Sequence, residues 1–181
     1  EFKQCYPKAN AILEVANTTK ISEKVANFEL DIGLIEGEIA HSELDVMPWR
    51  EDELVVFCSP DHPLANKKTL TDSDLIDTQW ILRESGSGTR QAFDFAMHGI
   101  LSQLDVELEL QHTEAIKRAV ESGMGIGCLS RITLEDAFKR GSLKPLNIPH
   151  RDFHRQFYLI VHKNKYRSSG IQNWIDLCLT N

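Results

Sequence analysis

The hydroxyl and glycine residues at 85–89 have the types and spacing of an anion-binding turn. The run Ser85-Gly86-Ser87-Gly88-Thr89 follows a strand-like segment and precedes a helical pattern of apolar residues. The first N–H groups of a helix have no partner within it, and the helix dipole places about half a positive charge there. Glycines let the backbone approach a ligand closely, and hydroxyls add further donors. The same residues would also serve simply as a cap and a turn, so the two interpretations are both open at this segment alone.

Two other places combine a strand-like run, polar residues and a helical pattern. The first carries Asn17, Thr18 and Thr19, any of which is a candidate helix cap, and the second carries His112 and Thr113. Ligands of open α/β sheets bind outside the carboxyl ends of the strands, where helices begin. We therefore predict one converging anion site. Its predicted ligand-binding residues are Asn17, Thr18, Thr19, Ser85, Gly86, Ser87, Gly88, Thr89, His112 and Thr113.

The sequence contains no pattern that predicts a cofactor or a metal site. It has no G-x-x-x-x-G-K-[ST] phosphate loop, and neither Ser85 nor Ser87 lies in a G-x-S-x-G nucleophile elbow. The glycines at 123–127 lead from a helix into a strand, which is the reverse of the order in a dinucleotide-binding loop. The seven histidines never pair at metal-ligand spacing. We expect no cofactor and no metal.

Composition limits the classes of partner. The formal net charge is −7, which argues against nucleic-acid binding by this polypeptide itself, and the basic run 162–167 is read as a solvated loop. No apolar run reaches the roughly 20 residues of a membrane span, and the first residues lack a signal-peptide pattern, so we expect a cytoplasmic protein that does not bind membranes. The scattered residues Cys5, Cys58, Cys128 and Cys178 are expected to be reduced, buried thiols.

Hydrophobic periodicity predicts an α/β unit in the first part of the chain. Its expected elements are strands at 11–16, 29–35, 44–49 and 53–58, and a helix that carries Ile21, Val25 and Phe28. A strand, a helix and a strand within so few residues predict a parallel strand pair with a right-handed crossover. The acidic run 51–53 is read as a solvated face.

The alternation of strands and helices starts again after residue 63. The expected elements are a helical turn at 72–75, strands at 79–82, 106–111 and 125–130, and helices with apolar residues at 92–100, 116–120 and 134–138. Gly123 and Gly141 are expected to end the last two of these helices. A strand at 153–161 and an amphipathic helix at 171–178 complete the chain.

These two patterns predict an α/β protein with two Rossmann-like lobes. Lobe I is expected to contain residues 1–62 and 153–181, and lobe II residues 63–152. The two lobes are then joined by two crossover strands, because the second lobe is inserted into the first. A cleft between the lobes, lined by the hydroxyl-bearing helix starts, is expected to hold the ligand.

Five segments occur in an order that resembles the effector-binding domain of LysR-type transcriptional regulators, and the resemblance covers essentially the whole chain. They are Leu13-Glu14-Val15-Ala16-Asn17-Thr18-Thr19, Glu29-Leu30-Asp31-Ile32-Gly33-Leu34-Ile35-Glu36-Gly37, Pro60-Asp61-His62-Pro63-Leu64, Arg83-Glu84-Ser85-Gly86-Ser87-Gly88-Thr89-Arg90 and Glu121-Ser122-Gly123-Met124-Gly125-Ile126.

The resemblance implies a fold like type 2 periplasmic binding proteins, with a cleft for a small inducer. It also implies homodimers within tetramers, built with the helix at 18–28, and DNA binding through an N-terminal winged helix-turn-helix that this chain does not contain. By position, the family's site falls on Thr18 and Thr19, on the loop 85–89 and on Thr113. Relatives that bind sulfur oxyanions place a threonine where this chain has Ala16, so the resemblance leaves the class of ligand open.

The predicted function is therefore sensing of a small anionic effector, an inorganic oxyanion or a short carboxylate, by a regulatory domain that is not an enzyme. One alternative is a solute-binding protein for a small anion. Another is a small two-lobe enzyme, for which the nearby candidate bases are Arg83, Glu84, Arg90 and His112. Glu84 is more simply an orienting partner for one of the two arginines.

Overall fold

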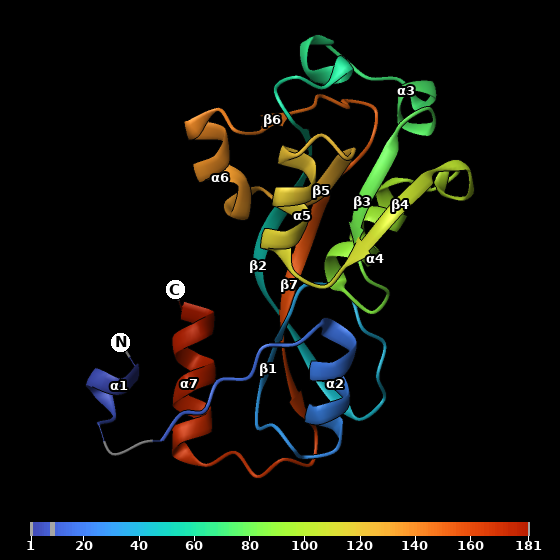
Figure 1. The fold of residues 1–181 in the computed structure, drawn as a ribbon. Helices are drawn as coiled ribbons and strands as arrows, with labels where there is room; N and C mark the ends of the chain where they lie inside the picture. Colours follow the sequence, from blue (N-terminus) through green and yellow to red (C-terminus); the bar gives the residue numbers. More distant parts are fainter. Residues whose placement is uncertain (1, 8–9, 181) are drawn as a thin grey trace. The chain divides into compact units, whose positions relative to one another are not determined.

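The computed structural model describes residues 2–7 and 10–180, except for the side chain of Cys5, and it divides into two units. Unit 1 contains Glu1–Glu51 and Gln156–Asn181, and unit 2 contains Asp52–Arg155 (Figure 1). The chain therefore passes between the units twice, at 51/52 and at 155/156. The sequence placed these boundaries at 62/63 and at 152/153.

Unit 1 is built on three strands with a helix on each face. Its elements are α1 (Phe2–Cys5), α2 (Thr18–Ala26), β1 (Gly33–Ile35), the first half of β2 (Leu44–Cys58), most of β7 (His154–His162) and α7 (Ser169–Thr180). The strand order is β1-β7-β2, and β1 is antiparallel to β7. Successive residues of a strand point to opposite faces. Ile160 accordingly packs in a cluster with α2, whereas its neighbours Leu159 and Val161 pack with Ile175 of α7.

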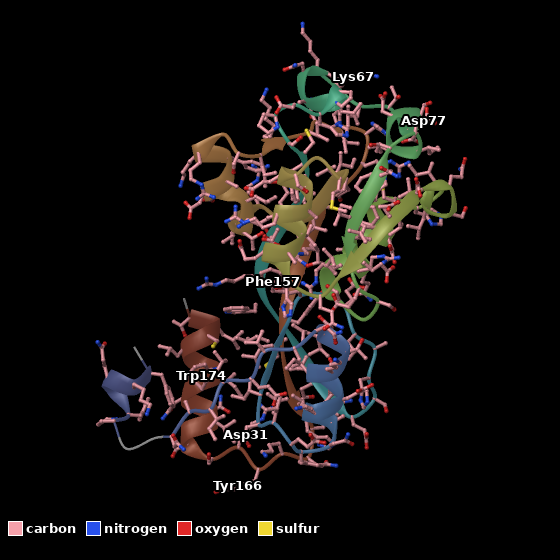
Figure 2. The ribbon with its side chains drawn as sticks, viewed as in Figure 1. Asp31, Lys67, Asp77, Phe157, Tyr166 and Trp174 are labelled. Carbon is pink, nitrogen blue, oxygen red and sulfur yellow. The ribbon has the colours of Figure 1, made fainter. Side chains whose placement is uncertain are left out.

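The short helix α1 packs against α7 through aromatic rings. Trp174 of α7, labelled in Figure 2, meets Phe2 in a T-shaped arrangement with the ring centroids 4.9 Å apart. Phe2 also lies 5.1 Å from the ring of Tyr6. Aromatic pairs of this kind contribute about 0.5–1.5 kcal/mol beyond the area they bury. The sequence did not predict α1, because four residues are too few to show a helical period.

The predicted strand at 11–16 is wrong. Residues 11–17 form no strand or helix, and the side chains of Ile12, Leu13 and Val15 are each 87% exposed. An apolar run indicates burial only where another element covers it, and no strand of the structure pairs with this one. The predicted parallel pair is wrong for the same reason, since the second expected strand shortens to β1 and pairs antiparallel with β7.

Two smaller expectations for the first 58 residues also need correction. The strands expected at 44–49 and 53–58 are one continuous strand, β2, which tolerates Pro48 where it forms an edge of the unit 1 strands. Phe28 was expected on the helix, but α2 ends at Ala26 and Phe28 has a left-handed φ of 60°. Its ring packs against that of His162 in a tilted arrangement, with the centroids 4.0 Å apart.

Unit 2 holds a mixed sheet in the order β2-β5-β3-β4, with β6 beside β2. Its further elements are the 3-10 helices Pro63–Asn66 and Leu101–Gln103, α3 (Asp72–Ile76), β3 (Gln79–Arg83), α4 (Gly88–Ala96), β4 (Asp105–Leu110), α5 (Thr113–Glu121), β5 (Ile126–Ser130), α6 (Arg131–Arg140) and β6 (Lys144–Pro145). The strands β5, β3 and β4 are parallel, and β2 is antiparallel to β5. The strands and helices expected between residues 63 and 141 are present, but α4 ends at Ala96, before the expected Ile100, and the two 3-10 helices and β6 were not expected.

Helices cover both faces of the unit 2 sheet. Trp80 and Leu82 of β3 pack in a cluster with Phe93 of α4. Ile81, between them on the strand, points to the other face and packs with α5 and α6. The helix α4 therefore lies on one face, and α5 and α6 lie on the other, as Figure 1 also shows. Gly141 ends α6 with a left-handed φ of 71°, as predicted.

Candidate functional site

The loop between β3 and α4 holds its hydroxyls in a buried, glycine-dependent turn. Ser87 N donates to Glu84 O over 3.2 Å, and Gly86 adopts a φ of 87° that favours glycine. The side chains of Ser87 and Thr89 are buried, at 3% relative exposure for each residue. Ser87 occupies the N-cap position but makes no side-chain cap bond to the helix. The simple capping role that the sequence left open does not account for this serine.

Two more helices of unit 2 begin with a polar residue that does not cap through its side chain. His112 is the exposed N-cap residue of α5, and the half-buried Thr113 is the first residue of that helix. Ser130 is the buried N-cap residue of α6. Sequence reasoning did not count Ser130 among the site residues and placed it only as the last residue of the strand expected at 125–130. A further signal was the threonine three residues later, because Thr133 Oγ1 donates to Ser130 O over 2.8 Å.

The parallel strands bring these three helix starts to one edge of the sheet. Arg83 of β3 lies opposite Leu110 of β4, so the loops after these strands begin side by side. Ile81 lies opposite Gly127 of β5, and from this pair the two parallel strands run on to their ends at Arg83 and Ser130. Neighbouring strands are about 4.8 Å apart. The loop 85–89, the start of α5 and the start of α6 therefore share the carboxyl edge.

The neighbouring strands β3 and β5 form a topological switch point. The chain leaves β3 into α4 on one face of the sheet and leaves β5 into α6 on the other. Open α/β sheets bind ligands at such points, outside the carboxyl ends of the strands. The buried hydroxyls of Ser87 and Thr89 lie on the β3 side, and Ser130 lies on the β5 side.

A buried network connects these two sides within unit 2. Arg155 Nη1 donates to Thr89 Oγ1 over 3.0 Å, and Arg155 Nε donates to Asp52 Oδ2 over 2.7 Å. Ser130 Oγ donates to Asp52 Oδ1 over 2.8 Å. The side chains of Arg155 and Asp52 are only 4% and 2% exposed. The interpretation of residues 51–53 as a solvated face is therefore wrong for Asp52, because a distant arginine compensates its charge.

The cations nearest the loop are paired with carboxylates. Arg83 Nε lies 2.9 Å from Glu84 Oε2, which confirms that Glu84 orients one of the two arginines. Arg90 Nε lies 2.9 Å from Asp94 Oδ1, and Arg90 also pairs with Glu109. The loop itself therefore offers an anion chiefly neutral donors, its hydroxyls and the first N–H groups of α4.

The predicted residues at 17–19 belong to unit 1. Asn17 is the N-cap of α2, and its Oδ1 accepts from Lys20 N over 3.1 Å. Thr18 is half-buried and Thr19 is exposed, at the first two positions of the helix. Seven of the ten predicted residues therefore share one edge of unit 2, and three share a helix start of unit 1.

Three of the four cysteines have side chains that the structure describes, and all three thiols are at least partly buried. Burial raises the pKa of Cys58 to about 11, and it raises the pKa of Cys128 and of Cys178 as well. These three cysteines are free, and the side chain of Cys5 lies outside the described part of the chain. Within residues 2–7 and 10–180 no group of three His, Cys, Asp or Glu side chains is arranged to hold a metal ion. No helix in the described part of the chain has the length and apolar character needed to cross a membrane.

The relatives found by sequence comparison are transcriptional regulators. YeiE of Escherichia coli, an uncharacterized HTH-type transcriptional regulator, is 38% identical over 98% of this chain and 60% of its own length. The transcriptional activator CmpR of Synechocystis is 32% identical over 97% of this chain and 58% of its own length. The chain thus spans about three fifths of the length of these regulators.

Solved structures match the fold closely. The regulatory domain of Synechocystis CcmR in complex with 2-PG is 34% identical with a TM-score of 0.86, covering 99% of this chain and 86% of that one. The effector-binding domain of QuiR in complex with shikimate, 22% identical, matches in fold with a TM-score of 0.85 over 99% of this chain and 85% of that one.

The model of the LysR substrate binding domain family matches residues 1–181. This match confirms the resemblance that the five sequence segments indicate, and the fold is that of LysR regulatory domains, like type 2 periplasmic binding proteins. The chain belongs to the LysR substrate-binding domain family, the effector-binding domains of LysR-type transcriptional regulators.

Proposed function

We propose that the chain senses a small anionic effector, an inorganic oxyanion or a short carboxylate. The observation that carries this proposal is the switch point of unit 2, where Ser87 and Thr89 are buried at the start of α4. The anion would lie against the loop 85–89, with His112 and Thr113 contributing from the next helix start. Helix N-termini that carry hydroxyls and glycines are suited to this ligand because their donors point outward and the dipole favours negative charge.

The neutral donors of the loop 85–89 favour an anion of low charge. Because Arg83 and Arg90 are already paired, no excess cation at the loop demands a highly charged or extended anion. Each hydrogen bond from a neutral donor to a charged group contributes about 1.5–3 kcal/mol. Four such bonds at the upper end of this range contribute about 12 kcal/mol. They give micromolar binding, about 8 kcal/mol, when the loss of ligand freedom costs about 4 kcal/mol, the low end of its range.

Closure of a cleft between lobe I and lobe II is the proposed response. In our proposal lobe I contains residues 1–62 and 153–181, and lobe II contains residues 63–152. The donors Asn17, Thr18 and Thr19 of lobe I would bind the anion together with the loop 85–89. An effector shifts a conformational equilibrium by its difference in affinity for the two states. Donors on both lobes give that difference, because both contact the ligand only in the closed state.

In the whole protein this closure would regulate transcription. We propose that the full-length regulator is a homodimer that assembles into tetramers, with α2 and its following residues up to Phe28 at a subunit contact. DNA would be bound by a winged helix-turn-helix outside this chain, and the protein would act in the cytoplasm. The complexes of the CcmR domain with 2-PG and of the QuiR domain with shikimate support a small-molecule effector for this domain.

A thermal-shift screen tests the proposed function. The chain is screened against sulfate, sulfite, thiosulfate, phosphate, 2-PG, shikimate and short carboxylates, together with Thr18→Ala and Ser87→Ala. A bound ligand stabilises by RT ln(1 + [L]/Kd), so 100 times Kd gives about 2.7 kcal/mol. We expect one class of anion to raise the melting temperature of the parent, with a much smaller rise in both variants.

The matched control is Ser73→Ala, which removes an exposed hydroxyl from the start of α3 in unit 2. It is expected to respond to the ligand as the parent does. The proposal fails if no anion stabilises the parent, or if Thr18→Ala and Ser87→Ala respond as fully as the control.

A further inference from the structure

A buried ion pair joins the two residues at which the chain enters and leaves unit 2. Asp52 is the first residue of that unit and Arg155 is the last, and Arg155 Nε lies 2.7 Å from Asp52 Oδ2. Removing two charges from water costs free energy, which their attraction offsets only when further hydrogen bonds satisfy the remaining groups. The partners that supply those bonds are therefore fixed in place by the pair.

These partners are the two helix starts that flank the switch point. Arg155 Nη1 donates to the hydroxyl of Thr89, the second residue of α4, over 3.0 Å. On the other side, Ser130 Oγ at the start of α6 donates to Asp52 Oδ1 over 2.8 Å. The chain of contacts runs from α4 to α6 without leaving unit 2.

The chemistry of the two charged groups sets the direction of each bond. A guanidinium only donates and a carboxylate only accepts, so Thr89 must accept from Arg155 and Ser130 must donate to Asp52. The hydroxyl proton of Thr89 therefore points away from the guanidinium. A hydroxyl that accepts from a charged donor is polarised and becomes a stronger donor itself.

We propose that Arg155 is a positioning residue for the effector site, held by Asp52 and acting through the hydroxyl of Thr89. It orients and polarises that hydroxyl as a donor at the start of α4, and its own charge stays compensated. This inference rests on the proposed function, because it assigns the site at the loop 85–89 its orienting group. A purely structural ion pair would stabilise unit 2 without any effect on the ligand's affinity.

Three variants and one control distinguish positioning of the Thr89 hydroxyl from a purely structural role of the ion pair. Asp52→Asn/Arg155→Gln removes both charges together, so that no charge is left buried without its partner. Thr89→Val removes the accepting hydroxyl at nearly constant shape, and Thr89→Ser keeps it. The matched control is Glu53→Gln/Arg131→Gln, a more exposed pair that joins the residues directly after Asp52 and Ser130.

Isothermal titration with 2-PG and with sulfate measures the affinity of each variant. We expect Asp52→Asn/Arg155→Gln and Thr89→Val each to bind about tenfold more weakly, with no further loss when they are combined, because they break one chain of contacts. Thr89→Ser and the control pair stay within about twofold of the parent. The inference is overturned if Asp52→Asn/Arg155→Gln binds the ligand as tightly as the parent does. It is also overturned if the combined variant loses about one hundredfold in affinity, the product of the two separate losses.

A ligand-free measurement keeps the inference separate from the proposed function. In a chain with carbon-13 threonine methyls, the Thr89 side chain is expected to hold one rotamer in the parent and in the control pair, and to average over rotamers in Asp52→Asn/Arg155→Gln. If neither probe binds the parent, the binding claim fails, and the Thr89 methyl still reports on positioning. A Thr89 rotamer that stays fixed in the charge-neutral variant overturns the inference.

Discussion

Replacing Phe93 by alanine should destabilise unit 2 severely, because this ring anchors α4 to the sheet. Phe93 is 1% exposed and its ring centroid lies 4.9 Å from that of Trp80. Truncating a buried phenylalanine costs about 3–5 kcal/mol from lost transfer energy and the cavity that remains. For a chain of this size, that corresponds to a fall in melting temperature of roughly 6–20 °C.

The same helix supplies the control. Phe95 lies two residues further along α4 and is 79% exposed, so Phe95→Ala should change the free energy of unfolding by about 0.5 kcal/mol or less. Urea denaturation followed by tryptophan fluorescence compares the two variants with the parent. A cost below about 1 kcal/mol for Phe93→Ala, or equal costs for the two, would refute the packing described for α4.

Three other predictions concern backbone, thiol and acid groups. Gly125→Ala should lower the free energy of unfolding by about 1–3 kcal/mol, and with it the urea midpoint, because φ is 155° and an added Cβ would lie 2.5 Å from Gln79 O; an unchanged midpoint contradicts this strain. Cys58 should not react with a thiol reagent at pH 8 until the chain unfolds, since burial raises its pKa to about 11; rapid labelling of the native chain contradicts its burial. The pKa of Asp74 is lowered to about 2, first by its hydrogen bond with Lys67, so its stabilising effect is present above pH 4 and is lost as the pH falls toward 2. Asp74→Asn should therefore lower the melting temperature at pH 7 and have no effect near pH 1, and an effect independent of pH refutes the assignment.

The sequence predicted unit 2 well because its signals there are local. Gly123 and Gly141 have the left-handed φ values that end helices, and the hydroxyls at 85–89 lie at a helix start as expected. The apolar period of each helix also marks the face that it packs on the sheet. Such features depend on neighbouring residues, and the amino-acid order contains them directly.

The failures arise where the outcome depends on distant residues. The run that contains Ile12 and Leu13 is as apolar as a buried strand, but no strand among the described residues pairs with it and its side chains stay exposed. Asp52 looks like a surface acid until Arg155, more than one hundred residues later, meets it in the core. Ser130 belongs to the same buried network, because its hydroxyl donates to Asp52. No local pattern specifies which distant side chain compensates a charge.

The central claim is that the start of α4 binds the anionic group of the effector. Its most direct test is nuclear magnetic resonance of the backbone amides while the chain is titrated with each oxyanion and carboxylate of the screen and with 2-PG. We predict that the amides of Gly86 and Gly88 shift saturably with one class of anion, while those of Gly99 and Gly141, which also lie in unit 2, stay unchanged. Saturable shifts confined to residues outside the loop 85–89 would contradict the claim.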